Sequence, residues 1–127
     1  MKKITLLIAA TTLLWSCSNK DEMKLQEIIT QTEQAVHPLM NESNLAYWNG
    51  TITGDSKEFD KYASANMKIT QIYSNRVVFA KLKSIKERGK IKDSLLNREL
   101  TVLYNQFLGN QTDTALLNSI IKKTAAL

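Results

Sequence analysis

Apolar residues recur at spacings of three and four along nearly the whole chain after Asp21, and this periodicity constrains the fold more than any other feature. No stretch alternates apolar and polar residues for the length of a β-strand. One face of an α-helix returns every three to four residues, so the pattern predicts helices throughout. We therefore expect an all-α domain of about five helices over residues 23–127.

The single proline falls inside the first of these helices, which is expected over residues 21–49. Pro38 has no amide hydrogen to donate within a helix, so we expect a kink or a break near His37. Residues 49–54 include two glycines and are predicted to form a turn.

Capping residues mark the later helices. Asp55 and Glu58 have the spacing of a capping box and predict a second helix that ends near Tyr73. The remaining predictions are a third helix from Ser74 to Gly89, a fourth from Asp93 to Gly109, and a fifth that begins at Thr112 or Asp113.

The fifth predicted helix reaches Leu127 without a residue that terminates helices. Together with the fourth helix it presents more apolar surface than a short body with few aromatic residues can cover. We expect this surface to pack against further helices, and the chain alone to behave as a loose helical assembly. The residues concerned are Leu103, Phe107, Leu117, Ile120 and Ile121.

Residues 1–16 have the order of an export signal. Lys2 and Lys3 precede an apolar run of 12 residues, from Ile4 to Trp15. A helix that crosses a bilayer needs roughly 20 such residues, so the run indicates a cleavable signal.

The apolar run ends in the pattern of a bacterial lipobox. Leu14 stands at its first position, Ser16 is the small residue before the cysteine, and Cys17 is the predicted site of lipidation, although Trp15 is bulkier than usual. Lipid attachment also explains a single cysteine without a disulfide partner. The alternative is an ordinary thiol that follows a generic secretory signal.

Removal of the leader leaves 111 of the 127 residues, which begin with Cys17 and a charged tether over 17–22. Several acyl chains would hold the protein on a membrane, since each buried methylene contributes about 0.8 kcal/mol. The tether lacks an Asp directly after the cysteine and resembles the export tag of surface-exposed lipoproteins in some Gram-negative lineages. We expect a bacterial outer-membrane location, and the tether is either such a tag or a solvated linker.

The composition argues against metal and nucleic-acid chemistry. The chain has 17 Lys and Arg against 12 Asp and Glu, and two of the lysines belong to the leader, which leaves a net charge of +3. So mild a balance does not indicate a nucleic-acid partner. With one histidine and one cysteine, the chain lacks the donors of a usual zinc site, so we expect no metal ligands and no catalytic residues.

Three local features allow more than one interpretation. Residues 76–98 carry eight cations and two acids, which indicates a solvated helix face or, as the alternative, a phosphate or headgroup site. His37 is the sole imidazole and fits a surface or helix-end role better than a catalytic one. Tyr47 and Trp48 fit core packing, or stacking on a ligand.

Three segments occur in the order found in one enzyme family: residues 45–54 (LAYWNGTITG), 79–83 (FAKLK) and 95–111 (LLNRELTVLYNQFLGNQ). They resemble the N-terminal helices of bacterial zinc peptidases of the angiotensin-converting-enzyme type, with thimet-type oligopeptidases as cousins. The resemblance extends from about Lys24 to Lys123. None of the segments is a catalytic signature.

The resemblance implies an almost entirely helical fold in which a deep cleft separates two halves. In that family, two His of a His-Glu-x-x-His helix and a downstream Glu hold zinc, several hundred residues beyond the matched region. Zinc is therefore a cofactor of the full-length family only, and no ligand carries over to this chain. What carries over is the role of lid helices at the cleft entrance, with Trp48 and Asn49 as candidate cleft-lining residues.

Two function classes remain open. In the first, the chain is a truncated lid-helix segment of a membrane-anchored zinc dipeptidyl carboxypeptidase, inactive alone, whose partner is the remainder of the peptidase or a peptide substrate. In the second, it is a small helical surface lipoprotein that binds a peptide or a protein. Both place the chain on a membrane through Cys17.

Overall fold

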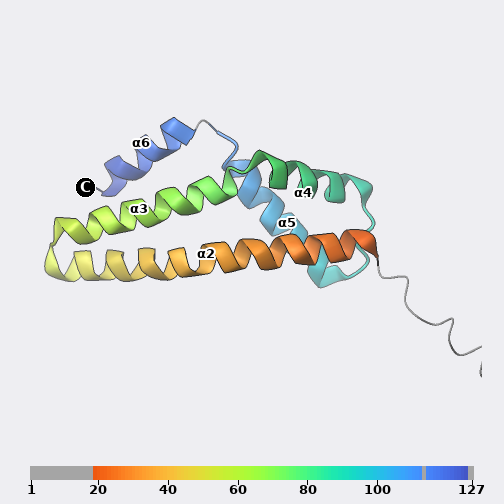
Figure 1. Cartoon of the computed structure of the whole chain (residues 1–127), viewed down its shortest axis with the longest axis horizontal. Coiled ribbons are helices and arrows are strands. Elements are labelled where there is room, and N and C mark those ends of the chain that lie inside the picture. Colours follow the sequence, from red (N-terminus) through yellow and green to blue (C-terminus); the bar gives the residue numbers. More distant parts are fainter. Residues whose placement is uncertain (1–18, 113, 126–127) are drawn as a thin grey trace, which may run out of the picture.

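The computed structural model describes residues 19–112 and 114–125, so the leader, Cys17 and Asp113 lie outside the described residues. This part consists of five helices and has no strand, which confirms the all-α prediction (Figure 1). The helices are α2 (Lys20–Thr53), α3 (Ser56–Tyr73), α4 (Arg76–Arg88), α5 (Ser94–Gly109) and α6 (Thr114–Ala125). None of them is both long and apolar enough to cross a membrane.

Helix α2 runs unbroken through Pro38, so the predicted break near His37 and the predicted turn over 49–54 are both wrong. A proline inside a helix costs about 3 kcal/mol. Val36 and Ser43, on either side of Pro38, are buried, and this packing holds the helix together across the missing hydrogen bond. The helix ends only at Gly54, which has a φ of 70°. The Gly54 amide donates a hydrogen bond to the Gly50 carbonyl oxygen.

Helix α2 extends along the length of the molecule, and α3 folds back antiparallel along the C-terminal part of α2 to form a hairpin (Figure 1). Small buried residues, Ala46 on α2 and Ala63 on α3, suit a close approach of the two helices. Gly50 belongs to the same contact, because a Cβ built on it would lie 3.1 Å from the Phe59 ring.

The observed caps agree in part with the predicted ones. Asp55 accepts a hydrogen bond from the Lys57 amide at 2.9 Å, but the Glu58 side chain pairs with Lys61, so only half of the capping box forms. Asp93 caps α5 through the Leu96 amide at 2.8 Å, and Gly89 ends α4 with a φ of 59°, as predicted. The predicted cap at Ser74 is wrong: Ser74 closes α3, and the following residue, Asn75, caps α4 through two amides.

The main core lies where α2, α4 and α5 meet. Its buried members are Leu25, Ile28, Leu82, Ile85, Leu96, Leu100 and Phe107. Phe107 does not belong to the apolar surface that we expected to pack against further helices, because its side chain is 1% exposed. Its ring meets the Tyr73 ring edge-on, with the ring centroids 5.3 Å apart. Leu103 is half-buried against the same core.

Helix α6 lies on the side of α3 that faces away from α2 (Figure 1). Ile121 is half-buried there, whereas Leu116 and Ile120 remain exposed. The Leu117 side chain lies outside the described atoms, so its expected outward position stays a prediction.

Candidate functional site

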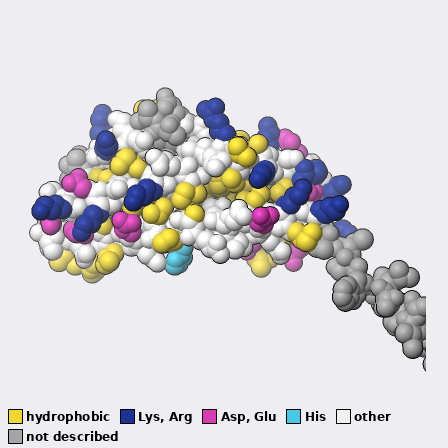
Figure 2. Space-filling view, in the orientation of Figure 1, with side chains coloured by type: hydrophobic (Ala, Val, Ile, Leu, Met, Phe, Trp, Pro, Cys, Tyr) yellow, Lys and Arg dark blue, Asp and Glu magenta, His cyan; other side chains and the backbone are white. Residues whose placement is uncertain are grey.

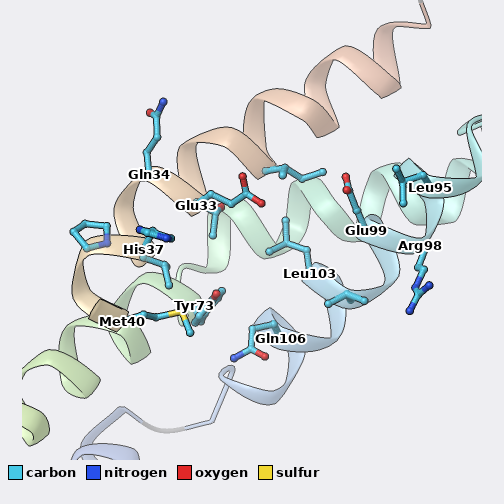
Figure 3. Close-up of a pocket in the computed structure, with 15 residues that line it drawn as sticks. Glu33, Gln34, His37, Met40, Tyr73, Leu95, Arg98, Glu99, Leu103 and Gln106 are labelled. Carbon is cyan, nitrogen blue, oxygen red and sulfur yellow. The ribbon is translucent and has the colours of Figure 1, made fainter. Parts of the chain in front are cut away.

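A groove of about 900 Å³ lies between α2 and α5 (Figure 3). It forms because α5 crosses α2 instead of lying along it (Figure 1). One wall runs from Ile29 to Met40 on α2, and the other from Leu95 to Gln106 on α5. Each wall covers about three helical turns, or roughly 17 Å. Tyr73, the last residue of α3, also lines the groove.

The groove is mainly apolar and reaches the surface. Val36 is buried in its wall, while Ile29, Leu103 and Tyr73 are half-buried. Two apolar side chains of α5, Leu95 and Val102, are 65% and 63% exposed, and Met40 lines the groove from α2 with about half of its surface exposed. Clustered exposed apolar side chains of this kind commonly mark a contact surface.

Two carboxylates flank the apolar surface from opposite walls, Glu33 from α2 and Glu99 from α5 (Figure 3). The Arg98 guanidinium points away from α2 in the same view. Burial raises the pKa of the Tyr73 hydroxyl, and the nearby charge of Glu33 raises it further. The groove therefore combines an apolar lining with two carboxylates and one guanidinium, a mildly negative balance that favours a cationic, partly apolar occupant.

The groove offers binding groups rather than a recognisable set of catalytic ones. His37 lines it, and its Nδ1 lies 3.3 Å from the Asn41 side-chain amide nitrogen. Over residues 19–112 and 114–125, no three His, Cys, Asp or Glu side chains gather closely enough to hold a metal ion.

The residues proposed from sequence to line a cleft lie elsewhere. Trp48 is 64% exposed on the outer face of α2, next to the exposed Leu45 and Ile52, and Asn49 is half-buried. Neither Trp48 nor Asn49 is among the residues that line the α2–α5 groove. Tyr47 packs on Tyr62 of α3, with ring centroids 5.3 Å apart. The proposed lipidation site, Cys17, lies outside the described residues.

Sequence reasoning missed Glu33, Glu99 and Val102. A signal was present in α5, where Leu95 and Val102 are spaced by two helical turns on a face different from that of the buried Leu96 and Leu100. A helix with apolar residues on a second face has two surfaces to cover. The sequence gives no comparable sign that Glu33 and Glu99 line one groove, because their proximity depends on how α2 and α5 cross.

No family model, curated protein or solved structure matches this chain. The likeness to zinc peptidases therefore rests on the three sequence segments alone.

Proposed function

We propose that this chain is a lipid-anchored helical binding module whose α2–α5 groove holds an amphipathic helix of another protein. The bound helix would place apolar side chains in the groove and basic side chains beside them. One observation carries the proposal: exposed apolar side chains from both walls line one groove together with two carboxylates, Glu33 and Glu99.

The dimensions of the groove support a helical occupant. Dividing the 900 Å³ volume by the wall length of roughly 17 Å leaves a cross-section of about 50 Å². This is enough for a row of side chains but not for a whole helix, whose diameter is about 10 Å or more. The occupant therefore inserts one face, as amphipathic helices do in apolar grooves.

The two kinds of side chain make different contributions. Burial of Leu95, Val102 and Met40 supplies affinity, at about 25 cal/mol for each Å² of apolar surface covered. Glu33 and Glu99 are exposed, so ion pairs with them add little affinity. They determine instead which helices fit and in which direction, since complementary charge mainly sets specificity.

The membrane location belongs to the same proposal. Cys17 carries the lipid, and the anchor holds the module on the bacterial outer membrane. The groove binds its partner at that membrane. The support is the order of leader, apolar run and cysteine in the sequence.

The test uses a synthetic helical peptide with leucines on one face and lysines beside them. Fluorescence anisotropy measures its binding to the wild type, to Val102→Glu and to Val77→Glu. Val77 is the matched control, because it is 66% exposed on α4 and does not line this groove. A glutamate in the groove would bury an unpaired charge, so we expect binding to Val102→Glu to weaken at least about ten-fold.

Val77→Glu should bind like the wild type. A second peptide with glutamate in place of every lysine should bind more weakly than the first, because Glu33 and Glu99 repel it. Equal losses for the two valine variants, or equal binding of the two peptides, would contradict the proposal.

A second candidate is the lid segment of a zinc peptidase. The observation that favours it is the exposure of Leu95 and Val102 on α5 and of Leu116 and Ile120 on α6. In that case, helices encoded downstream would cover these side chains and the peptidase's zinc would lie in the downstream part. Reading the DNA beyond codon 127 in three frames tests it: a His-Glu-x-x-His run supports the lid, and its absence leaves the binding module.

A further inference from the structure

The described chain begins at a densely charged end of the molecule. Here the first turn of α2 meets the last turn of α4 and the loop 89–93, and Figure 2 shows Lys and Arg side chains gathered at this end. The Asn19 side chain donates to the Lys90 carbonyl oxygen, and the Glu22 carboxylate accepts from the Lys92 amide at 2.8 Å. These bonds fasten the loop to α2.

The acids at this end are largely occupied by bonds within the protein. Asp21 is buried and accepts two hydrogen bonds of 2.8 Å from Arg88, which holds the pKa of its carboxyl below the usual range. Glu22 accepts from backbone amides, Asp93 caps α5, and Glu87 lies 3.9 Å from Lys83. These bonds keep the carboxylates against the protein but leave their negative charges in place.

Four lysines at this end remain directed to solvent: Lys20, Lys24, Lys90 and Lys92. The salt bridges of the described residues involve Lys61, Lys83 and Arg88, and none of these four. Lys90 and Lys24 also contribute to the lowered pKa of Asp21, so their charges act on the same spot. Met23 adds an exposed apolar side chain beside them.

The proposed anchor brings this end close to a membrane. Asn19 is two positions after Cys17, and two residue steps of chain span at most about 7 Å. That is shorter than the distance of about 10 Å over which charges act at 0.1 M salt. A lipid on Cys17 therefore leaves the four lysines within electrostatic reach of the headgroups.

We propose that this lysine surface, made of Lys20, Lys24, Lys90 and Lys92, docks on anionic lipid headgroups and orients α2 away from the membrane plane. The inference rests on the proposed lipid anchor at Cys17 and adds the surface that faces the membrane. Each lysine near an anionic surface gains roughly a five-fold preference for it. With this end on the headgroups, the turn at Gly54 stands about 50 Å away along α2.

The test uses the lipidated wild-type protein, reconstituted into vesicles of phosphatidylcholine alone or of phosphatidylcholine mixed with phosphatidylglycerol. A water-soluble acetylating reagent modifies exposed lysines, and mass spectrometry gives the rate at each position. Lys57 and Lys68 on α3 are exposed internal controls far from the tether. We expect the four lysines to react at least about three-fold more slowly on the anionic vesicles, and the two controls to react equally on both.

Salt near 0.5 M should remove the protection, because it shortens the reach of charges to about 4 Å. A Lys90→Glu, Lys92→Glu double variant should lose protection at Lys20 and Lys24, whereas Lys57→Glu, Lys68→Glu should not. Equal reaction rates on the two kinds of vesicle would overturn the inference while leaving the anchor intact. Failure of the protein to float with phosphatidylcholine vesicles would overturn the anchor, and the inference with it.

Discussion

Asp21 and Arg88 join the start of α2 to the end of α4, through paired hydrogen bonds of 2.8 Å. The carboxylate is buried and the guanidinium is about one-third exposed, so the pair is neither a free surface bridge nor a fully desolvated one. Its planar, two-bond geometry fixes the last turn of α4 on the first turn of α2.

The pair predicts a pH dependence of stability. Arg88 lowers the pKa of Asp21 below its usual 3.8, so the stabilisation is complete above that value and is lost as the pH falls through the lower folded pKa. We expect Asp21→Asn to reduce the free energy of unfolding at pH 7, and expect the difference from wild type to shrink at about pH 2. Urea titrations at both pH values measure it. An Asp60→Asn control should change little at either pH, and a pH-independent loss for Asp21→Asn would contradict the account.

Phe107 is the largest fully buried side chain and contacts Tyr73 as well as the main core. We expect Phe107→Ala to lower the free energy of unfolding by about 3–5 kcal/mol, because it leaves a cavity between α3 and α5. Thermal unfolding followed by circular dichroism measures the loss. Its neighbour Leu108 is about half exposed, and Leu108→Ala should cost no more than about 1 kcal/mol. Similar losses for both variants would mean that Phe107 lies outside the core.

At the scale of elements, the α2–α3 hairpin depends on close packing of small residues. A Cβ at Gly50 would touch the Phe59 ring, whereas one at Gly109 meets nothing within 4 Å. We expect Gly50→Val to cost about 1–3 kcal/mol through overpacking, and Gly109→Val to be nearly neutral. Chemical denaturation compares the two. Equal stability of the two variants would show that the hairpin can accommodate a larger side chain at Gly50, and would contradict close packing there.

The elements also show what the sequence could predict. Local sequence signals correctly predicted that Asp93 begins α5 and that Gly89 ends α4. An N-cap or a left-handed glycine depends only on its immediate neighbours in the chain. The continuity of α2 through Pro38 was not predictable in that way, since packing on both sides of the proline sustains it. The groove depends on the crossing of α2 and α5, so the sequence could not predict that Glu33 and Glu99 line the same groove.

At the scale of the whole molecule, α6 differs from the rest. Helices α2, α4 and α5 share the main core, while the contacts of α6 are chiefly with α3. We expect α2 to α5 to unfold as one cooperative unit and amides of α6 to exchange with solvent at least about ten-fold faster. Hydrogen exchange with mass spectrometry distinguishes the two. Uniformly fast exchange would instead support the loose assembly predicted from the sequence.

The role of the groove is tested most directly by mapping where the leucine- and lysine-bearing peptide binds. Heteronuclear NMR of the isotope-labelled chain, titrated with this peptide, follows every backbone amide. We expect the largest shifts along both walls, around Glu33 and His37 on α2 and around Glu99 and Val102 on α5. Shifts centred on the exposed Trp48 face of α2, or no shifts at about 1 mM peptide, would contradict the assignment of the α2–α5 groove as the binding site.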